Sequence, residues 1–154
     1  MTDVMAQGCH RHGLRIYVED TDAGGIVYHA NYLRYAERGR SEALRVLGYP
    51  HAEMMRTEGR MFVVRRVELD YERPALLDDW ITVETRTIAV AAARVRLAQT
   101  ILRETLTLAR ICLDLACVSV AEGRPVRLPP AMRAALEAMR DCGTTSGMIS
   151  VKGT

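Results

Sequence analysis

The order of the chain's periodic segments is the feature that most constrains its fold. One long helical segment, residues 30–47, precedes four apolar, partly β-branched runs that no helix of similar length interrupts. Consecutive strands with short connections pair antiparallel, and a helix with one apolar side has to be covered. The order therefore predicts an α+β fold in which an antiparallel sheet curls around the helix 30–47.

The boundaries of these elements follow from local patterns. Gly48 and Pro50 end the long helix, because glycine closes helices readily and proline cannot continue one. Shorter helices are expected at His51–Thr57 and Ala131–Arg140, and residues 89–93 are expected to form a hairpin connection, although alanines favour a helix. The expected apolar stripe of the long helix is Leu33, Ala36, Arg40, Leu44 and Leu47. The expected strands are Leu14–Glu19, Phe62–Tyr71, Trp80–Ile88, Arg94–Arg103 and Leu106–Val120.

Length and composition predict one domain. The chain has 154 residues, of which 49% are apolar, enough to supply a real core. We expect a flexible N-terminal arm at residues 1–12, one folded domain at 13–141, and a polar, flexible C-terminal tail at 142–154.

Charge and hydropathy argue against several classes of protein. A formal charge of +2 gives no electrostatic case for binding nucleic acid, which would require a dense basic face. Because no run of eighteen apolar residues occurs, a membrane span is not expected. The first eleven residues lack the basic start and apolar stretch of a secretory signal, so a cytoplasmic location is the expectation.

The four cysteines, Cys9, Cys112, Cys117 and Cys142, lie in separate settings without the paired spacing of a zinc site. Reduced thiols are therefore expected. The cluster Cys9-His10-Arg11-His12 could bind a metal, but we expect no metal site in this chain.

The segment from Glu19 to Tyr32 has the strongest functional pattern, E-D-T-D-A-G-G-I-V-Y-H-A-N-Y. It connects a strand to the long helix, and such loops often carry chemistry. Gly24 and Gly25 give the backbone freedom to turn sharply and let another molecule approach the main chain closely.

The start of the helix adds a second functional feature. Its first backbone N–H groups have no partner within the helix and carry partial positive charge, so they can hold a carbonyl oxygen that becomes negative. Asp22 and the N–H around His29 would together suit acyl transfer. The alternatives are that Asp22 is an ordinary turn former, that His29 is a packing residue, and that Tyr28 and Tyr32 are core or wall residues.

These residues resemble the hotdog-fold acyl-CoA thioesterases. Within that group they look most like the bacterial Tol-Pal-associated acyl-CoA thioesterases and their relatives, the 4-hydroxybenzoyl-CoA thioesterases. The similarity is strong over residues 15–48, good over 61–79 and weak beyond residue 88. It rests on the loop string above, on Y-A-E-R-G-R-S-E-A-L-R, and on F-V-V-R-R-V-E-L-D-Y-E-R-P-A-L-L-D-D.

The resemblance implies a hotdog fold and assigns roles to residues of the loop. Asp22 matches the family's catalytic carboxylate, which either attacks the thioester carbonyl or activates water. The backbone N–H of His29 matches the donor that polarises that carbonyl. Tyr28 and the His29 side chain would line the acyl or thiolate region, and Asn31 would cap or brace the helix start.

The resemblance also implies a substrate and partners. The substrate would be an acyl-CoA, or an acyl group on acyl carrier protein, and no metal or redox cofactor would be needed. Homodimers or homotetramers are common in the family. Where relatives have polar residues that hold the nucleotide end of coenzyme A, this chain has alanines at 91–93, so Arg65 and Arg94, or else Arg66 and Arg96, are the expected substitutes.

Other functions stay open at the level of sequence. The same pocket could bind an acyl thioester without hydrolysing it, or the chain could be a scaffold for a lipid or envelope complex. A hotdog dehydratase is a further alternative, but the loop motif fits hydrolysis better.

Overall fold

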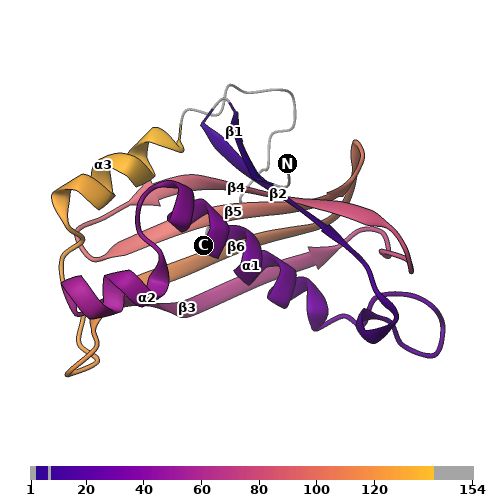
Figure 1. The fold of residues 1–154 in the computed structure, drawn as a ribbon, viewed down its shortest axis with the longest axis horizontal. Helices are drawn as coiled ribbons and strands as arrows, with labels where there is room; N and C mark the ends of the chain where they lie inside the picture. The colour runs from indigo at the N-terminus through magenta and orange to yellow at the C-terminus, as the bar shows by residue number, and fades with distance from the viewer. Residues whose placement is uncertain (1–2, 7, 141–154) are drawn as a thin grey trace.

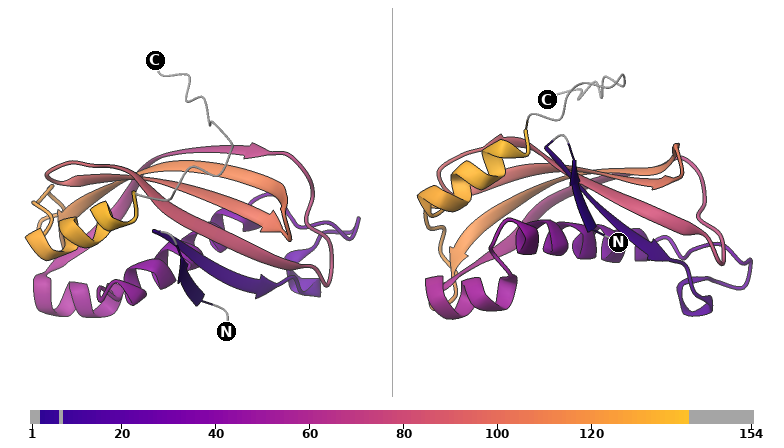
Figure 2. Two further views of the ribbon diagram at one scale, coloured as in Figure 1. Left: turned by 90° about the horizontal axis from the view of Figure 1, so that it is seen from above. Right: turned by 45° about the horizontal axis from the view of Figure 1, so that its top comes forward.

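Six antiparallel strands form one curved sheet in the order β1-β2-β4-β5-β6-β3 (Figure 1). The computed structural model describes residues 3–6 and 8–140. The strands are β1 (Asp3–Ala6), β2 (Cys9–Arg15), β3 (Arg60–Tyr71), β4 (Trp80–Val90), β5 (Arg94–Arg103) and β6 (Leu106–Ser119). The long helix α1 (Asn31–Val46) lies along one face of this sheet (Figure 2). The predicted α+β architecture, a hotdog fold, is confirmed.

Shorter helical elements complete the fold. A 3-10 turn, η1 (Val18–Asp20), follows β2, and α2 (His51–Glu53) continues into a π-helical segment, η2 (Met54–Glu58). The last helix is α3 (Pro130–Ala138). Within the described part of the chain, none of the helices has the length and apolarity needed to cross a membrane.

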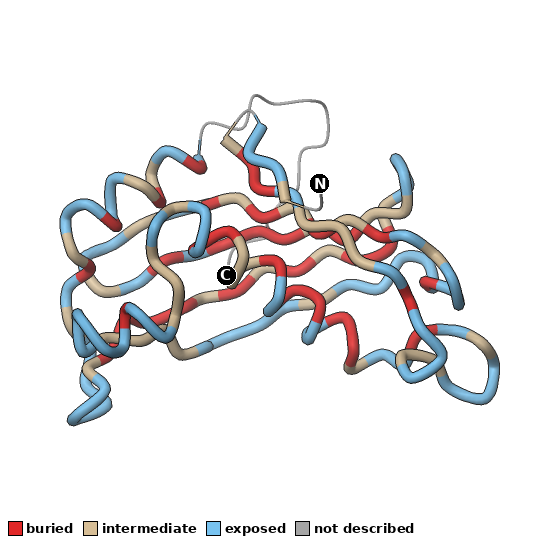
Figure 3. Tube along the Cα trace, viewed as in Figure 1, coloured by how far each residue is buried: buried red, intermediate tan, exposed pale blue. Residues whose placement is uncertain are grey.

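The buried residues gather between α1 and the middle strands β4, β5 and β6 (Figure 3). At Gly39 the helix approaches the sheet closely, because an added Cβ there would lie 2.5 Å from Cγ1 of Val83. The buried side of α1 differs from the predicted apolar stripe, because Leu33, which was predicted to lie in that stripe, is 43% exposed. The buried side of α1 comprises Asn31, Tyr32, Tyr35, Ala36, Gly39, Ala43 and Leu44.

A row of buried polar side chains crosses the sheet beneath α1. His10, Thr85 and Gln99 are at most 1% exposed, and each pairs with the next across β2, β4 and β5. The Gln99 amide donates to the backbone carbonyl of Ala36 at 2.8 Å and to the Thr85 hydroxyl at 2.9 Å. These two bonds tie the middle of α1 to the sheet.

The first strand differs from the prediction. It spans Cys9–Arg15 rather than Leu14–Glu19, and β1 pairs with it to form a hairpin, so residues 3–6 and 9–12 are not a flexible arm. The chain leaves the sheet at Ile16, whose amide donates to the carbonyl of Asp79 at 2.9 Å. Residues 142–154, the predicted tail, lie outside the described residues.

The later strands match their predictions to within two residues at each end. The connection at residues 89–93 is a hairpin, as predicted: β4 ends at Val90, and the amide of Ala91 donates to the carbonyl of Arg94 at 2.8 Å. The short helix expected at 51–57 is present as α2 and η2, and the final helix starts one residue earlier than predicted and ends at Ala138.

Candidate active site

The connection between β2 and α1, residues 16–30, folds as two arms that pair with each other, and the first arm contains the 3-10 turn η1. A bridge joins Thr21 to Val27, and the amide of Tyr28 donates to the carbonyl of Asp20 at 3.0 Å. The second arm also pairs with the connection between β3 and β4, since Val27 donates to the carbonyl of Ala75 at 2.9 Å. Main-chain hydrogen bonds therefore fix the shape of this loop, which we call the acidic loop.

Asp22 lies at the exposed tip of the acidic loop. Its Oδ1 accepts a hydrogen bond from the amide of Gly24 at 2.8 Å, and its backbone carbonyl accepts one from Gly25 at 3.1 Å. Asp22 is thus a turn former, as one interpretation of the sequence expected. Within the described residues, however, no hydrogen bond is found to its Oδ2, so one carboxylate oxygen is left for other chemistry.

The two glycines of the loop have different roles. An added Cβ at Gly24 would lie 3.3 Å from Oδ1 of Asp22, so glycine leaves that oxygen room. Gly25 has a φ of 77°, in the left-handed region that other residues rarely adopt, and this closes the turn.

The tip of α1 presents two backbone amides next to this loop. The amide of Asn31 donates to the carbonyl of Tyr28 at 2.9 Å, and that of Tyr28 is taken by Asp20. Between them, the N–H groups of His29 and Ala30 find no acceptor among residues 3–6 and 8–140. They are the donors available to an incoming oxygen.

Asn31 braces the helix start and does not cap it. The N-cap residue is Ala30, without a side-chain capping bond. The buried Asn31 side chain instead donates from Nδ2 to the carbonyl of Asp20 at 2.9 Å, while its Oδ1 lies 3.4 Å from a guanidinium nitrogen of Arg34. This links the first turn of α1 to the acidic loop.

Two further tyrosines also hold the helix tip, of which the sequence pointed only to Tyr32. The hydroxyl of Tyr71, the last residue of β3, donates to the carbonyl of His29 at 2.7 Å. The hydroxyl of Tyr32, a core residue as one interpretation expected, accepts a hydrogen bond from the amide of Ala75 at 2.8 Å. The two rings meet edge to face with centroids 5.2 Å apart. Burial raises the pKa of both tyrosines, so both hydroxyls keep their protons at neutral pH.

Exposed aromatic and apolar side chains surround this part of the molecule. The rings of Tyr28 and His29 are 4.5 Å apart, and Tyr28 is 49% exposed. An apolar acyl group would find contacts here. The other exposed apolar side chains of this region are Tyr17, Val18, Ile26, Leu76 and Leu77.

The predicted phosphate-binding arginines lie elsewhere on the sheet. Arg65 sits at a β-bulge of β3, and Arg94 begins β5, so the two flank β6 near Leu115. Tyr71, beside the helix tip, pairs with Ala109 of β6, roughly six residues or about 20 Å away along that strand. The structure brings Arg65 and Arg94 to the same part of the sheet but not to the acidic loop.

The alternative arginines of that region are already paired. Arg96 binds Asp114 through two hydrogen bonds of 2.7 and 3.1 Å, which lower the pKa of the Asp114 carboxyl. Arg66 lies 2.6 Å from Glu68. For Arg65 and Arg94 no such ion pair occurs within the described ranges, so they remain the better candidates to meet a phosphate.

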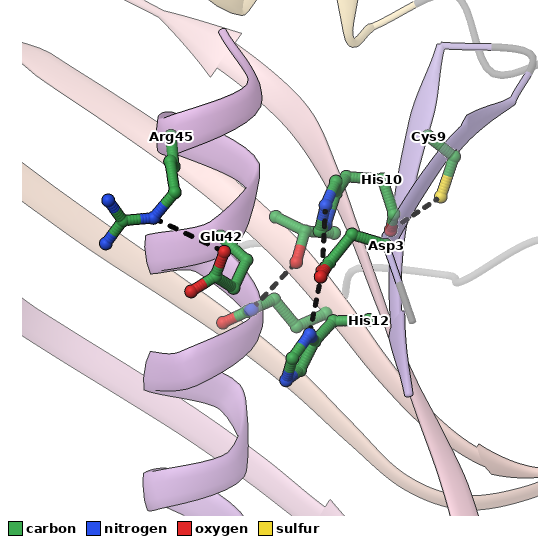
Figure 4. Close-up of polar contacts among 8 residues, drawn as sticks. Asp3, Cys9, His10, His12, Glu42 and Arg45 are labelled. Atoms are coloured by element: carbon green, nitrogen blue, oxygen red, sulfur yellow. Dashed lines mark hydrogen bonds and ion pairs between the residues drawn. The ribbon is translucent and has the colours of Figure 1, made fainter. Parts of the chain in front are cut away.

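In the structure, the cluster Cys9-His10-Arg11-His12 makes contacts with other protein groups rather than forming a set of metal ligands. His10 and His12 both point toward Asp3, with nitrogens 3.5 and 2.7 Å from its Oδ1, while Cys9 donates to a backbone carbonyl (Figure 4). Within the described residues, no group of three potential ligands could hold a metal ion.

A shallow groove lies between α1 and His12 of strand β2. Its volume is about 600 Å³, and its walls include neither Asp22 nor His29. The residues that line it are His12, Arg34, Glu37, Arg38, Ser41 and Glu42.

Comparison with known proteins agrees with this architecture. The model of the thioesterase-like superfamily matches residues 16–136. The chain is 39% identical over 127 residues to the acyl-CoA thioesterase YbgC of Haemophilus influenzae, which covers 82% of this chain and 93% of that protein. It is 37% identical over 117 residues to the acyl-CoA thioester hydrolase YbgC of Escherichia coli O6:H1, with 75% and 87% covered.

Solved structures give the same result. A crystal structure of a probable thioesterase from Bartonella henselae superposes with a TM-score of 0.76 at 40% identity, covering 79% of this chain and 99% of that one. The chain therefore belongs to the thioesterase-like superfamily and has the fold of a thioester hydrolase.

Proposed function

We propose that this protein is an acyl-CoA thioesterase that hydrolyses its substrate to a free acid and coenzyme A, with Asp22 as nucleophile or general base. The observation that carries the proposal is the acidic loop itself, which folds back on the tip of α1 and leaves a carboxylate oxygen and two amide N–H groups without partners among the described residues. The names of the similar YbgC proteins support the same substrate class.

The geometry of the two arms suits attack on a carbonyl. Asp22 lies opposite Ile26, and Ile26 precedes Tyr28 and His29 by two to three residues, or about 7–10 Å along the arm. The Asp22 side chain and a thioester carbonyl can together span that gap. The His29 N–H would then stabilise negative charge on the carbonyl oxygen while Asp22 attacks the carbon or removes a proton from water.

The neighbouring residues would position the substrate. Gly24 and Gly25 allow the thioester to approach the backbone, and Asn31 holds the helix tip against the loop. Tyr28 and the His29 ring would contact the acyl or thiol portion. Arg65 and Arg94 would bind the phosphates of coenzyme A. Because coenzyme A is part of the substrate, the reaction needs no separate cofactor.

The edge strand β3 supports a homodimer or homotetramer. Among residues 3–6 and 8–140 it pairs with β6 on one side only, and Val64, Val67 and Tyr71 are 46%, 39% and 50% exposed along it. A second copy of the chain could cover this edge.

The proposal further includes acyl carrier protein as an alternative carrier of the acyl group, a cytoplasmic location and an association with the Tol-Pal system. Co-purification from cells tests the Tol-Pal association.

A thiol-release assay with short, long and aromatic acyl-CoAs tests the proposed reaction. Wild-type protein should release coenzyme A from at least one of them. The variants Asp22→Ala and Asp22→Asn should fold normally and lose about 100-fold or more in turnover, as expected for a lost acid-base or nucleophilic group. Glu19→Gln, which alters another exposed acid of the same loop, is the matched control and should retain activity.

Two results would contradict the proposal. Full turnover by a well-folded Asp22→Ala protein would remove Asp22 from the mechanism. Binding of acyl-CoA without thiol release by the wild type would indicate a binding module instead.

A further inference from the structure

We propose that Tyr71 is a positioning residue for the thioesterase reaction, and that it acts through the peptide unit between His29 and Ala30 so that the Ala30 N–H becomes a second donor to the thioester oxygen. The proposal rests on the proposed function. The contact that carries it is the 2.7 Å hydrogen bond from the Tyr71 hydroxyl to the His29 carbonyl, which spans 42 residues of sequence.

The Tyr71 hydroxyl gives the His29 carbonyl a hydrogen bond that helix α1 does not supply. Helix α1 begins at Asn31, so the carbonyl of His29 stands just outside the regular bonding of the helix. Tyr71 supplies its donor from the end of strand β3. The plane of the peptide unit between residues 29 and 30 is thereby fixed relative to the sheet, and with it the direction of the Ala30 N–H.

The same bond makes the Ala30 N–H a stronger donor. A hydrogen bond to the carbonyl oxygen of an amide polarises the whole group, and linked hydrogen bonds strengthen one another by about 10–30%. The carbonyl of His29 and the N–H of Ala30 belong to one amide. Electron density drawn toward the His29 carbonyl oxygen by the Tyr71 hydroxyl therefore increases the positive charge on the Ala30 amide hydrogen, which faces outward from the helix tip.

Tyr71 is itself held firmly enough to act in this way. Its ring meets that of Tyr32 edge to face at 86°. Tyr32 is 2% exposed, and its hydroxyl is bonded to the amide of Ala75, a residue with no exposed surface. The Tyr71 hydroxyl is thus aligned by packing, and its donation to His29 links β3 directly to the amide pair.

Removing the hydroxyl alone tests the inference. Tyr71→Phe keeps the ring and its contact with Tyr32 but loses the bond to His29. We expect kcat to fall about three- to tenfold, as for one net hydrogen bond, while KM for acyl-CoA and the melting temperature stay close to wild type. Tyr49→Phe, which removes the hydroxyl of another half-buried tyrosine far from the loop, should leave kcat unchanged.

A second measurement separates polarisation from packing. Replacing Tyr71 alone by 3-fluorotyrosine makes the hydroxyl a better donor without changing its position. We expect kcat to rise above that of wild type at a pH where the hydroxyl is protonated. A purely structural role predicts no such rise.

The outcomes also distinguish this inference from the proposed function. If wild type releases no thiol from any acyl-CoA, the proposed function fails. If wild type is active and Tyr71→Phe and 3-fluorotyrosine proteins match its kcat, the proposed function stands and the role of Tyr71 is overturned.

Discussion

The side chain of Gln99 reaches from strand β5 to the backbone carbonyl of Ala36 in the middle of α1, at 2.8 Å, and also donates to Thr85. Gln99→Leu removes both bonds from a site with almost no exposure to water. We expect the free energy of unfolding to fall by about 1–3 kcal/mol, because the Thr85 hydroxyl is left buried without its donor. Urea unfolding followed by circular dichroism measures this.

Thr87→Val is the matched control for Gln99→Leu. The Thr87 hydroxyl is also buried, but it has no hydrogen-bond partner in the described structure. Its removal should change the free energy of unfolding by less than about 0.5 kcal/mol or stabilise the fold. Equal losses in the two variants would show that the bonds of Gln99 do not hold α1.

His10 makes the stability of the fold depend on pH. Burial lowers the pKa of His10, and the nearby Asp3 carboxylate only partly offsets this. In the unfolded chain a histidine takes up a proton near pH 6.5, so below that pH the unfolded state binds more protons than the folded state. His51 shifts in the same direction, mainly through burial. Stability should therefore be highest above about pH 6.5 and fall as the pH drops toward 5.5.

Denaturant unfolding at pH 7.5 and 5.5 checks the contribution of His10. The difference in free energy of unfolding between the two pH values should be smaller for His10→Gln than for wild type. The paired carboxyl of Asp114, whose pKa is lowered, loses its contribution only in stronger acid and does not affect this window. An unchanged difference in His10→Gln would exclude His10 as the source.

Arg103 should control the rigidity of the acidic loop from a distance. It lies 2.7 Å from Asp79, whose carboxylate also accepts the amide of Leu76, and Leu76 forms a bridge with Ile26 of the loop. Arg103→Gln should leave the fold intact and speed hydrogen exchange at the Val27 amide, which is bonded to Ala75, by an amount equivalent to about 1 kcal/mol.

Arg96→Gln is the control for Arg103→Gln, because Arg96 lies on the same strand and is equally well paired, but with Asp114. Its substitution should leave exchange at Val27 unchanged. Faster exchange in both variants would show a general loss of stability rather than a local effect on the loop.

The strands that carry the core could be predicted because they are runs of apolar, partly β-branched residues. The run Arg94–Arg103 was located to the residue. The strand β2 differs from the prediction for a physical reason: residues 1–12 are predicted to form a flexible arm, yet His10 is completely buried beside Thr85. A buried histidine gives no local pattern from which its environment can be inferred.

Only those residues of the candidate site that lie close together in the sequence could be predicted. Asp22, Gly24, Gly25 and His29 lie within eight residues of one another, and their resemblance to a known motif located the loop. Tyr71 lies 42 residues from His29, and nothing in its neighbourhood indicates that its hydroxyl reaches the helix tip. Such contacts depend on how strands and helix pack and require coordinates.

The acidic loop keeps its shape through bonds between main-chain atoms, such as that of Tyr28 with Asp20 and that of Val27 with Ala75. Its outward side chains at Ala23, Ile26 and Tyr28 take no part in those bonds. Substitutions at these three positions can therefore change the exposed surface of the loop without altering the course of its backbone.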